Sequence, residues 1–280
     1  MQNDRKSLFV SIVGKPNVGK SSMLNMIVNS KISIVSPKPQ TTRNKITGIL
    51  TQDNIQLVFT DTPGLLNPRS RLGNYMVSEI NNSFSGCEAC IHVVEAGKSI
   101  CNADLKLMDK FRKMKIPIIL VINKIDLLKD KSVIMEQIKD YTDKFEYFAV
   151  VPISAKSGNG REELIKELSN LAEPSVFFFD EDDITDQTER VLVSEVIREK
   201  MLHLLDKELP HGAAVFIEYF HERNDGMADI SAVIYCEREN HKAIIIGKGG
   251  RMLKNIGTLA RKELEEMLMK KINLNVGLVP

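Results

Sequence analysis

The stretch Gly14-Lys15-Pro16-Asn17-Val18-Gly19-Lys20-Ser21 has the pattern G-x-x-x-x-G-K-S, which is the phosphate-binding P-loop. An apolar, β-branched run at residues 8–13 precedes it and predicts a buried strand. Residues 22–29 follow with apolar side chains at a spacing that suits a helix packed on a sheet. Because a strand, a glycine loop and a helix are the setting that this motif needs, the pattern predicts a nucleoside triphosphate site.

The chemistry of the motif follows from its residue types. Gly14 and Gly19 let the backbone bend and approach phosphate oxygens without a Cβ atom in the way. The amides of the loop and of the first helical turn then point at the anion, and the helix dipole favours it further. We expect Lys20 to reach the β- and γ-phosphates and the Ser21 hydroxyl to be a Mg²⁺ ligand. The alternative is a glycine-rich turn without a ligand, which the later motifs disfavour.

The bulk properties of the chain limit the classes to consider. A length of 280 residues suggests one large domain or two ordinary ones, and 43% hydrophobic with 27% charged residues is typical of a globular protein. The net charge of +1 gives no global sign of nucleic-acid binding. We expect no transmembrane segment and no signal peptide, since residues 1–7 are polar and no long apolar run exists. We interpret the lone C-x-x-C of Cys87 and Cys90 as reduced cysteines beginning a buried strand, rather than a redox or half-zinc site.

A proline-containing stretch at residues 36–43 separates the P-loop helix from a predicted strand at residues 45–50. This is where a P-loop GTPase keeps its first switch, with a threonine that meets Mg²⁺ and the γ-phosphate. Thr42 is our choice for that threonine, and Thr41 is the alternative.

The next predicted strand, residues 55–60, runs into Asp61-Thr62-Pro63-Gly64-Leu65. Asp61 can hold Mg²⁺ through water, and Gly64 is placed so that its amide can bond the γ-phosphate. Hydrolysis would break that bond and release the loop at residues 65–75. We therefore expect metal binding by Ser21, Thr42 and Asp61.

Leu65 bears on the rate of hydrolysis. Ras-type enzymes have a glutamine after D-x-x-G that orients the attacking water, whereas an apolar side chain cannot do so. We therefore expect slow intrinsic hydrolysis. Asn17 is a candidate to compensate, because its side-chain oxygen could hold a monovalent cation such as K⁺ beside the phosphates. The predicted catalytic residues are Asn17, Lys20, Thr42 and Gly64.

Two more buried-looking strands, residues 89–95 and 116–122, lead to Asn123-Lys124-Ile125-Asp126, the N-K-x-D set that selects guanine. Asp126 can accept hydrogen bonds from guanine N1 and N2, which adenine cannot offer. Asn123 can bond the base edge or brace the loop, and the Lys124 stem can stack on the ring. The alternative is a solvated turn after a strand.

A last strand at residues 148–153 precedes Ser154-Ala155-Lys156, and we expect the Ala155 amide to be aimed at the guanine carbonyl oxygen. With a closing helix at residues 161–171, strands alternate with helices over residues 1–172. This predicts an α/β domain with a mostly parallel sheet and its ligands at the carboxyl ends of the strands. The predicted nucleotide-binding residues are Gly14, Lys15, Pro16, Asn17, Val18, Gly19, Lys20, Ser21, Asp61, Thr62, Pro63, Gly64, Leu65, Asn123, Lys124, Asp126, Ser154, Ala155 and Lys156.

The second half of the chain predicts a smaller α+β domain at residues 190–280, after a linker at residues 173–189. Its pattern is a long amphipathic helix, two alternating strands, a helix, the G-x-x-G loop Gly247-Lys248-Gly249-Gly250, a further helix and a strand. The predicted ranges are 190–209 for the first helix, 215–220 and 230–236 for the strands, and 252–269 for the helix after the loop. This is the order of a type II KH domain, whose loop clamps about four nucleotides of RNA.

Charge segregation favours the same interpretation, because residues 240–262 contain several basic residues and no acidic one. Without that context, the G-x-x-G could be only a tight helix-capping loop. The predicted RNA-binding residues are Lys242, Gly247, Lys248, Gly249, Gly250, Arg251 and Lys254.

The motifs taken together are similar to those of the translation-factor class of GTPases. Asn17, the Thr41-Thr42-Arg43 triplet and Leu65 are similar to the subgroup that contains Era, EngA and the tRNA-modification GTPases. A GTPase of this subgroup joined to one type II KH domain resembles the Era family. That resemblance implies a GTP/GDP- and Mg²⁺-dependent switch that binds the 3′ end of small-subunit ribosomal RNA and assists assembly of the small ribosomal subunit.

The resemblance also implies a monomer in the cytoplasm that can associate peripherally with the inner face of the cell membrane. An alternative is an RNA-binding module whose nucleotide only sets domain orientation, with negligible intrinsic hydrolysis. One departure is at the end of the chain, because the family has a longer last KH strand and a basic tail. We therefore expect a short final strand, without the RNA contacts of that tail, at residues 270–280.

Overall fold

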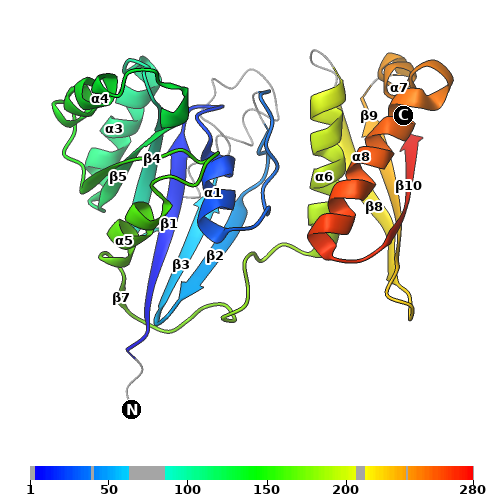
Figure 1. Cartoon of the computed structure of the whole chain (residues 1–280), viewed down its shortest axis with the longest axis horizontal. Helices are drawn as coiled ribbons and strands as arrows, with labels where there is room; N and C mark the ends of the chain where they lie inside the picture. Colours follow the sequence, from blue (N-terminus) through cyan, green and yellow to red (C-terminus); the bar gives the residue numbers. More distant parts are fainter. Residues whose placement is uncertain (1–3, 39–40, 63–85, 206–211, 238, 280) are drawn as a thin grey trace. The chain divides into compact units, whose positions relative to one another are not determined.

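The structure is a computed structural model, and it forms two compact units (Figure 1). The residues that it describes are 4–38, 41–62, 86–205, 212–237 and 239–279. The first unit comprises residues 1–33 and 42–186, and the second comprises residues 34–41 and 187–280. Within the described ranges, no helix is long and apolar enough to cross a membrane.

The first unit is built on a seven-stranded sheet with the order β2-β3-β1-β4-β5-β6, in which β7 pairs with β1. Strand β1 runs parallel to β3 and β4, and β5 is parallel to β4 and β6. Strand β2 is antiparallel to its partner β3, and β7 is antiparallel to its partner β1. The strands are β1 (Lys6–Gly14), β2 (Ile46–Gln52), β3 (Ile55–Asp61), β4 (Ala89–Glu95), β5 (Ile118–Asn123), β6 (Ala149–Pro152) and β7 (Glu173–Pro174). The mostly parallel α/β prediction is confirmed.

Helices cover both faces of this sheet, because side chains of the buried strands alternate between two cores. In β4, Ile91 and Val93 pack with α1 and α5, whereas Cys90 and Val94 belong to the clusters under α3 and α4. The helices are α1 (Lys20–Val28), α3 (Asn102–Met114), α4 (Ser132–Thr142) and α5 (Arg161–Ser169). In the described part of the chain, helices therefore cover both faces of the sheet, and we look for ligand sites at the ends of its strands.

The second unit packs helices on one face of a three-stranded sheet with the order β10-β9-β8. Strands β8 and β9 are antiparallel, and β10 is parallel to β9. The elements in order are α6 (Glu189–Leu204), β8 (Ala213–Glu222), β9 (Ala228–Cys236), α7 (Glu239–Ile246), η3 (Lys248–Gly250), α8 (Arg251–Leu268) and β10 (Ile272–Val279). This order confirms the predicted KH fold.

A short piece of the N-terminal half, Ile34–Thr41, groups with the second unit rather than with the first. The Val35 amide donates to Glu199 Oε1 at 2.8 Å, and Arg198 donates to the Thr41 carbonyl at 2.5 Å. Val35 and Thr41, at or beside the predicted first switch, therefore contact α6, whereas Thr42 belongs to the first unit.

The predicted lengths of two elements in the second unit are wrong. The first helix ends at Leu204 rather than at residue 209, because Leu205 leaves helical geometry with φ −101° and ψ 143°. The final strand is not short: β10 has 8 residues, and each pairs with β9, from Ile272 opposite Ala228 to Val279 opposite Tyr235. Parallel pairing with β9 therefore extends over the whole of β10. The remaining helix and strand boundaries that we predicted differ from the observed ones by at most two residues.

We predict that Ile256→Ala in α8 destabilises the second unit by about 2–5 kcal/mol, because it leaves a cavity in a packed core. Ile256 is fully buried, whereas the neighbouring Leu259 is 40% exposed. Leu259→Ala is the matched control and should change stability by less than about 0.5 kcal/mol. Urea unfolding followed by circular dichroism measures both, and equal losses would contradict the assigned core.

Candidate functional site

The predicted phosphate loop joins β1 to α1 and is shaped by two glycines with positive φ. Gly14 has φ +156°, and a Cβ atom there would lie 2.4 Å from the Val93 carbonyl oxygen. Gly19 has φ +95°, and its Cβ would lie 2.3 Å from the Asn123 side-chain nitrogen. The loop is therefore packed tightly against β4 and against the end of β5, and larger residues would displace it.

Lys20 begins α1 and is buried, with 6% of its surface exposed. Its Nζ lies 3.2 Å from the Lys15 carbonyl oxygen and 3.4 Å from that of Gly14. Burial lowers the pKa of Lys20, although the Asp61 carboxylate partly offsets this. The ammonium group is thus held inside the curve of the loop by main-chain oxygens that a phosphate can replace.

The three predicted metal ligands lie together at the edge of the sheet. Ser21 Oγ is 2.7 Å from Asp61 Oδ2 and 2.9 Å from Thr42 Oγ1, and Thr42 Oγ1 is 3.4 Å from the same carboxylate oxygen. Burial raises the pKa of Asp61, against the opposing effect of Lys20 and these hydroxyls. Asp61 Oδ1 is buried and has no hydrogen-bond partner within the described ranges. A set of oxygen ligands with one unsatisfied carboxylate oxygen fits a hard cation such as Mg²⁺.

Asn123 ties together the loops of the predicted base site. Its Nδ2 donates to the Val18 carbonyl at 2.9 Å, and its Oδ1 accepts from the amides of Lys124 at 2.7 Å and Ala155 at 3.0 Å. Of the two roles left open for Asn123, the structure therefore shows bracing. The Ala155 amide, which we expected to be aimed at the guanine carbonyl, donates to Asn123 instead, since the two loops pack together.

The other base-site residues have defined partners. Asp126 Oδ1 accepts a hydrogen bond of 2.6 Å from Ser154 Oγ, which fixes the carboxylate beside the third loop. Lys124 has φ +68°, and its Nζ forms a 2.6 Å ion pair with Glu95 Oε2 at the end of β4. The tie to Glu95, which was not anticipated from the sequence, holds the lysine stem in place. Lys156 follows this group and is exposed.

The second switch lies mostly outside the described residues. Thr62 is the last residue of the motif with a described position, and its hydroxyl donates to the Ile12 carbonyl at 2.8 Å. The predicted roles of Pro63, Gly64 and Leu65, and the release of residues 65–75, concern positions that the structure does not describe.

The G-x-x-G loop forms the turn between α7 and α8. Gly247, Gly249 and Gly250 all have positive φ, at +70°, +61° and +75°, and a Cβ atom on Gly249 or Gly250 would meet nothing within 4 Å. Lys248, Arg251 and Lys254 are exposed at or just after the loop, and Lys242 on α7 is partly buried. The loop is therefore open at Gly249 and Gly250, with exposed positive charge beside it, whereas Gly247 packs closely against Met252.

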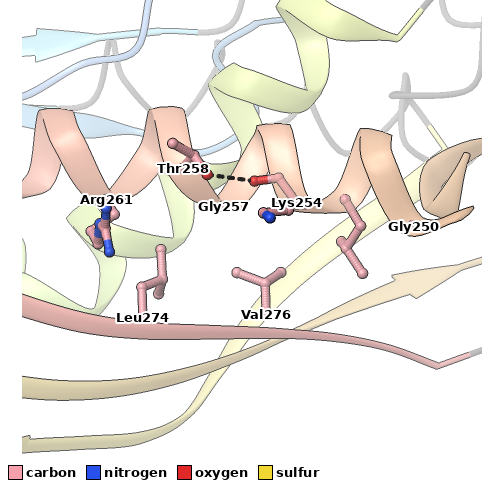
Figure 2. A pocket seen from close by; sticks show the side chains of 8 residues that line it. Gly250, Lys254, Gly257, Thr258, Arg261, Leu274 and Val276 are labelled. Atoms are coloured by element: carbon pink, nitrogen blue, oxygen red, sulfur yellow. Dashed lines mark hydrogen bonds between the residues drawn. The ribbon is translucent and has the colours of Figure 1, made fainter.

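A groove between α8 and β10 continues from this loop, and it has a volume of about 340 Å³ (Figure 2). Figure 2 shows Leu274 and Val276 on β10 facing α8, with Lys254 and Arg261 on the helix side. The lining residues are Gly250, Leu253, Lys254, Gly257, Thr258, Arg261, Leu274 and Val276. The sequence reasoning missed all of these except Gly250 and Lys254. The lining residues from Gly250 to Arg261 recur at a spacing of three or four residues, which places them on one face of a helix. This spacing could have indicated them in the sequence.

The comparisons with known proteins identify both domains. Residues 9–124 match a family described as a 50S ribosome-binding GTPase, and residues 208–279 match the KH domain. The chain is 48% identical over 272 residues to the GTPase Era of Clostridioides difficile strain 630, and the match covers 97% of this chain and 92% of the relative. The chain belongs to the Era GTPase family. Era of Thermoanaerobacter sp. strain X514 is 45% identical over 274 residues, covering 97% and 90%.

Solved Era structures have the same fold over nearly the whole chain. An Aquifex aeolicus Era variant bound to GDP·AlF4⁻ superposes with a TM-score of 0.93 at 37% identity, covering 98% of this chain and 94% of the other. An Era structure with MgGDPNP and nucleotides 1506–1542 of 16S ribosomal RNA also has a TM-score of 0.93 and 37% identity, covering 99% and 94%. As a member of the Era family, the protein is a GTPase.

We predict that Gly14→Ala weakens GDP binding by at least about tenfold, or ~1.4 kcal/mol. The added Cβ would meet the Val93 carbonyl, a main-chain atom that cannot move aside. Gly86→Ala is the control, because Gly86 also has positive φ (+82°), but a Cβ atom there would meet no described residue within 4 Å. Titration with a fluorescent GDP analogue measures both, and equal affinities for the two variants would contradict the assigned loop.

Proposed function

We propose that this Era-family GTPase binds the 3′-end region of small-subunit ribosomal RNA through its KH unit and assists assembly of the small ribosomal subunit. The observation that carries the proposal is the α8–β10 groove, which opens beside the G-x-x-G loop and has Lys254 and Arg261 along it. Support comes from the Era structure that holds nucleotides of 16S ribosomal RNA.

In the proposed nucleotide site, the loop amides from Gly14 to Ser21 and the Lys20 ammonium bind the phosphates. Lys20 would exchange its main-chain partners for phosphate oxygens without moving out of the loop, since those oxygens line the same curve. The Asp126 carboxylate, oriented by Ser154, would accept from guanine, and Lys124 would flank the base. Gly64 and Thr42 remain our proposals for the residues that sense the γ-phosphate.

Ser21, Thr42 and Asp61 would hold Mg²⁺, since their oxygens already lie together and one carboxylate oxygen is unsatisfied. When bound, the ion neutralises phosphate charge during hydrolysis. Hydrogen bonds of the Ser21 and Thr42 hydroxyls to Asp61 Oδ2 hold this carboxylate in place. Ser21→Ala would remove one ligand and one of these donors together.

Asn17 is our proposal for a K⁺ ligand that compensates for Leu65. Asn17 has φ +64°, a left-handed conformation, in the middle of the P-loop. We predict that replacing Na⁺ with K⁺ raises GTP turnover of the wild type several-fold and leaves Asn17→Ala unchanged. Turnover is measured by phosphate release at constant ionic strength. Equal rates for the wild type in the two salts would remove the support for a cation site at Asn17.

In the proposed RNA site, the bare backbone of the G-x-x-G loop lets phosphates approach, and Lys248 and Arg251 supply charge. Bases would lie in the groove, where Leu253, Leu274 and Val276 give an apolar surface and Arg261 and Thr258 give polar contacts. Lys242, on α7, and Lys254, on α8, are the other basic residues in the proposed set. One wall of the groove is β10, and β10 pairs with β9 along its whole length.

We predict that a short RNA matching the 3′ end of small-subunit ribosomal RNA stimulates GTP hydrolysis in K⁺ buffer. Gly249→Asp should abolish binding and stimulation, since it puts a carboxylate where phosphates approach. The matched control is Gly226→Asp in the β8–β9 turn, because Gly226 also has positive φ (+82°) and open space around it. Gly226→Asp should behave as the wild type.

The outcomes of this RNA experiment separate the two functions that we considered. Binding without stimulation would favour an RNA-binding module whose nucleotide only sets domain orientation. Absence of binding by the wild type would overturn the proposed RNA site. Because the matching family is described as 50S ribosome-binding, the same assay includes purified 30S and 50S subunits, and stimulation by 50S alone would overturn the choice of the small subunit.

We also propose that the protein is a cytoplasmic monomer that can associate peripherally with the inner face of the cell membrane. This proposal rests on the family resemblance alone. Sedimentation velocity tests the monomer, and co-sedimentation with vesicles of anionic lipid tests the membrane association. A stable dimer, or no binding to the vesicles, would overturn the corresponding part.

A further inference from the structure

A buried acidic residue, Asp104, lies behind the P-loop and belongs to none of the motifs. It is in the first turn of α3, and its side chain is fully buried. Burial alone would raise its pKa, but the interactions with His92, the Cys101 amide and Lys15 outweigh this and hold the pKa of Asp104 well below its usual range. A buried carboxylate stays ionised only if its partners offset the free-energy cost of removing its charge from water. The partners of Asp104 therefore indicate its role.

One of these partners is Lys15, the first variable position of the P-loop. Lys15 Nζ lies 3.1 Å from Asp104 Oδ2, and the lysine side chain is 24% exposed. The same carboxylate oxygen accepts from the Cys101 amide at 3.0 Å and from the Tyr141 hydroxyl at 3.3 Å. The carboxylate is therefore fixed by α3 and α4, both of which are anchored on the sheet, and it presents a fixed charge to the loop.

The other end of Lys15 touches the phosphate-binding group. Its main-chain carbonyl accepts a hydrogen bond of 3.2 Å from Lys20 Nζ. A continuous series of contacts therefore runs from Asp104, through the side chain and then the main chain of Lys15, to the ammonium of Lys20. The P-loop pattern fixes Lys20 but leaves the residue at position 15 open, so the motif itself does not explain why a lysine is there.

We propose that Asp104 is a positioning residue for the nucleotide site: its ion pair with Lys15 holds the main chain of the P-loop so that Lys20 is aimed at the phosphates. The proposal rests on the nucleotide site assigned above and adds a residue to it from outside every motif. Lys15 binds phosphate through its backbone amide, and its side chain serves as the tether. Without this ion pair, nucleotide binding would have to order the loop. The entropy lost in ordering it would weaken the affinity for the nucleotide.

His92 lies on the opposite side of the carboxylate and does not compete for this role. Its Nε2 is 3.7 Å from Asp104 Oδ1, and its Nδ1 is 2.9 Å from the Tyr147 hydroxyl. Burial lowers the pKa of His92, so the imidazole is neutral at pH 7. The full positive charge that faces Asp104 is therefore that of Lys15.

A double-mutant cycle on the full chain tests the proposal, with the affinity for a fluorescent GDP analogue as the readout. Asp104→Asn keeps the shape of the side chain and an acceptor for the Cys101 amide but removes the charge. We expect it to weaken binding about tenfold, the usual scale for a charge-assisted hydrogen bond. Lys15→Met should weaken binding to a similar extent, and the double variant should be no weaker than either single one.

Three further measurements keep the test decisive. Lys15→Arg keeps the charge and should retain most of the affinity, whereas Tyr141→Phe removes a different donor to the same oxygen and should bind normally. Thermal unfolding of each variant separates stability from binding. Additive losses in the cycle, or normal binding by Lys15→Met, would overturn the proposal even if Asp104→Asn does not fold. Failure of the wild type to bind GDP would instead overturn the nucleotide site.

Discussion

The nucleotide site depends on one constraint, which is that the parallel strands β1, β3 and β5 all end at the same edge of the sheet. Because these strands run in one direction, the P-loop after β1, Asp61 at the end of β3 and Asn123 at the end of β5 arrive at the same edge. Both faces of the sheet are covered by helices, so this edge is where the buried strands meet solvent. Motifs far apart in the chain therefore become one site.

Packing between the loops then fixes the positions of the side chains in the site. Asn123 joins three loops through its amide group, and Gly19 is needed because that amide occupies the space of a Cβ atom. Ser21, Thr42 and Asp61 share hydrogen bonds that keep their oxygens together. These contacts restrict the loops to one arrangement, and a site that is held in place loses less entropy on binding.

The sequence predicted much of this arrangement because its motifs are local. The strand, loop and helix around the P-loop, the oxygens that we propose as metal ligands and the order of the KH elements follow from residue spacing and alternation. The end of α6 was predicted wrongly, since the helix stops where Leu205 takes an extended backbone conformation. The length of β10 was predicted wrongly because it is decided by long-range pairing with β9 rather than by local pattern. The groove between α8 and β10 was missed for the same reason, since its walls come from elements whose contact no local pattern encodes.

The sequence by itself determined the family, the chemistry of the phosphate and base motifs, and the charge segregation around the G-x-x-G loop, because these depend on residue types at short spacing. Only the tertiary structure decided that the Asn123 amide is used in bracing, that Glu95 ties Lys124, and that Asp104 pairs with Lys15. In each case the partners are separated in the chain and meet because the parallel sheet brings its loops to one edge. The distance between charges, and so the strength of their interaction, is a property of that packing.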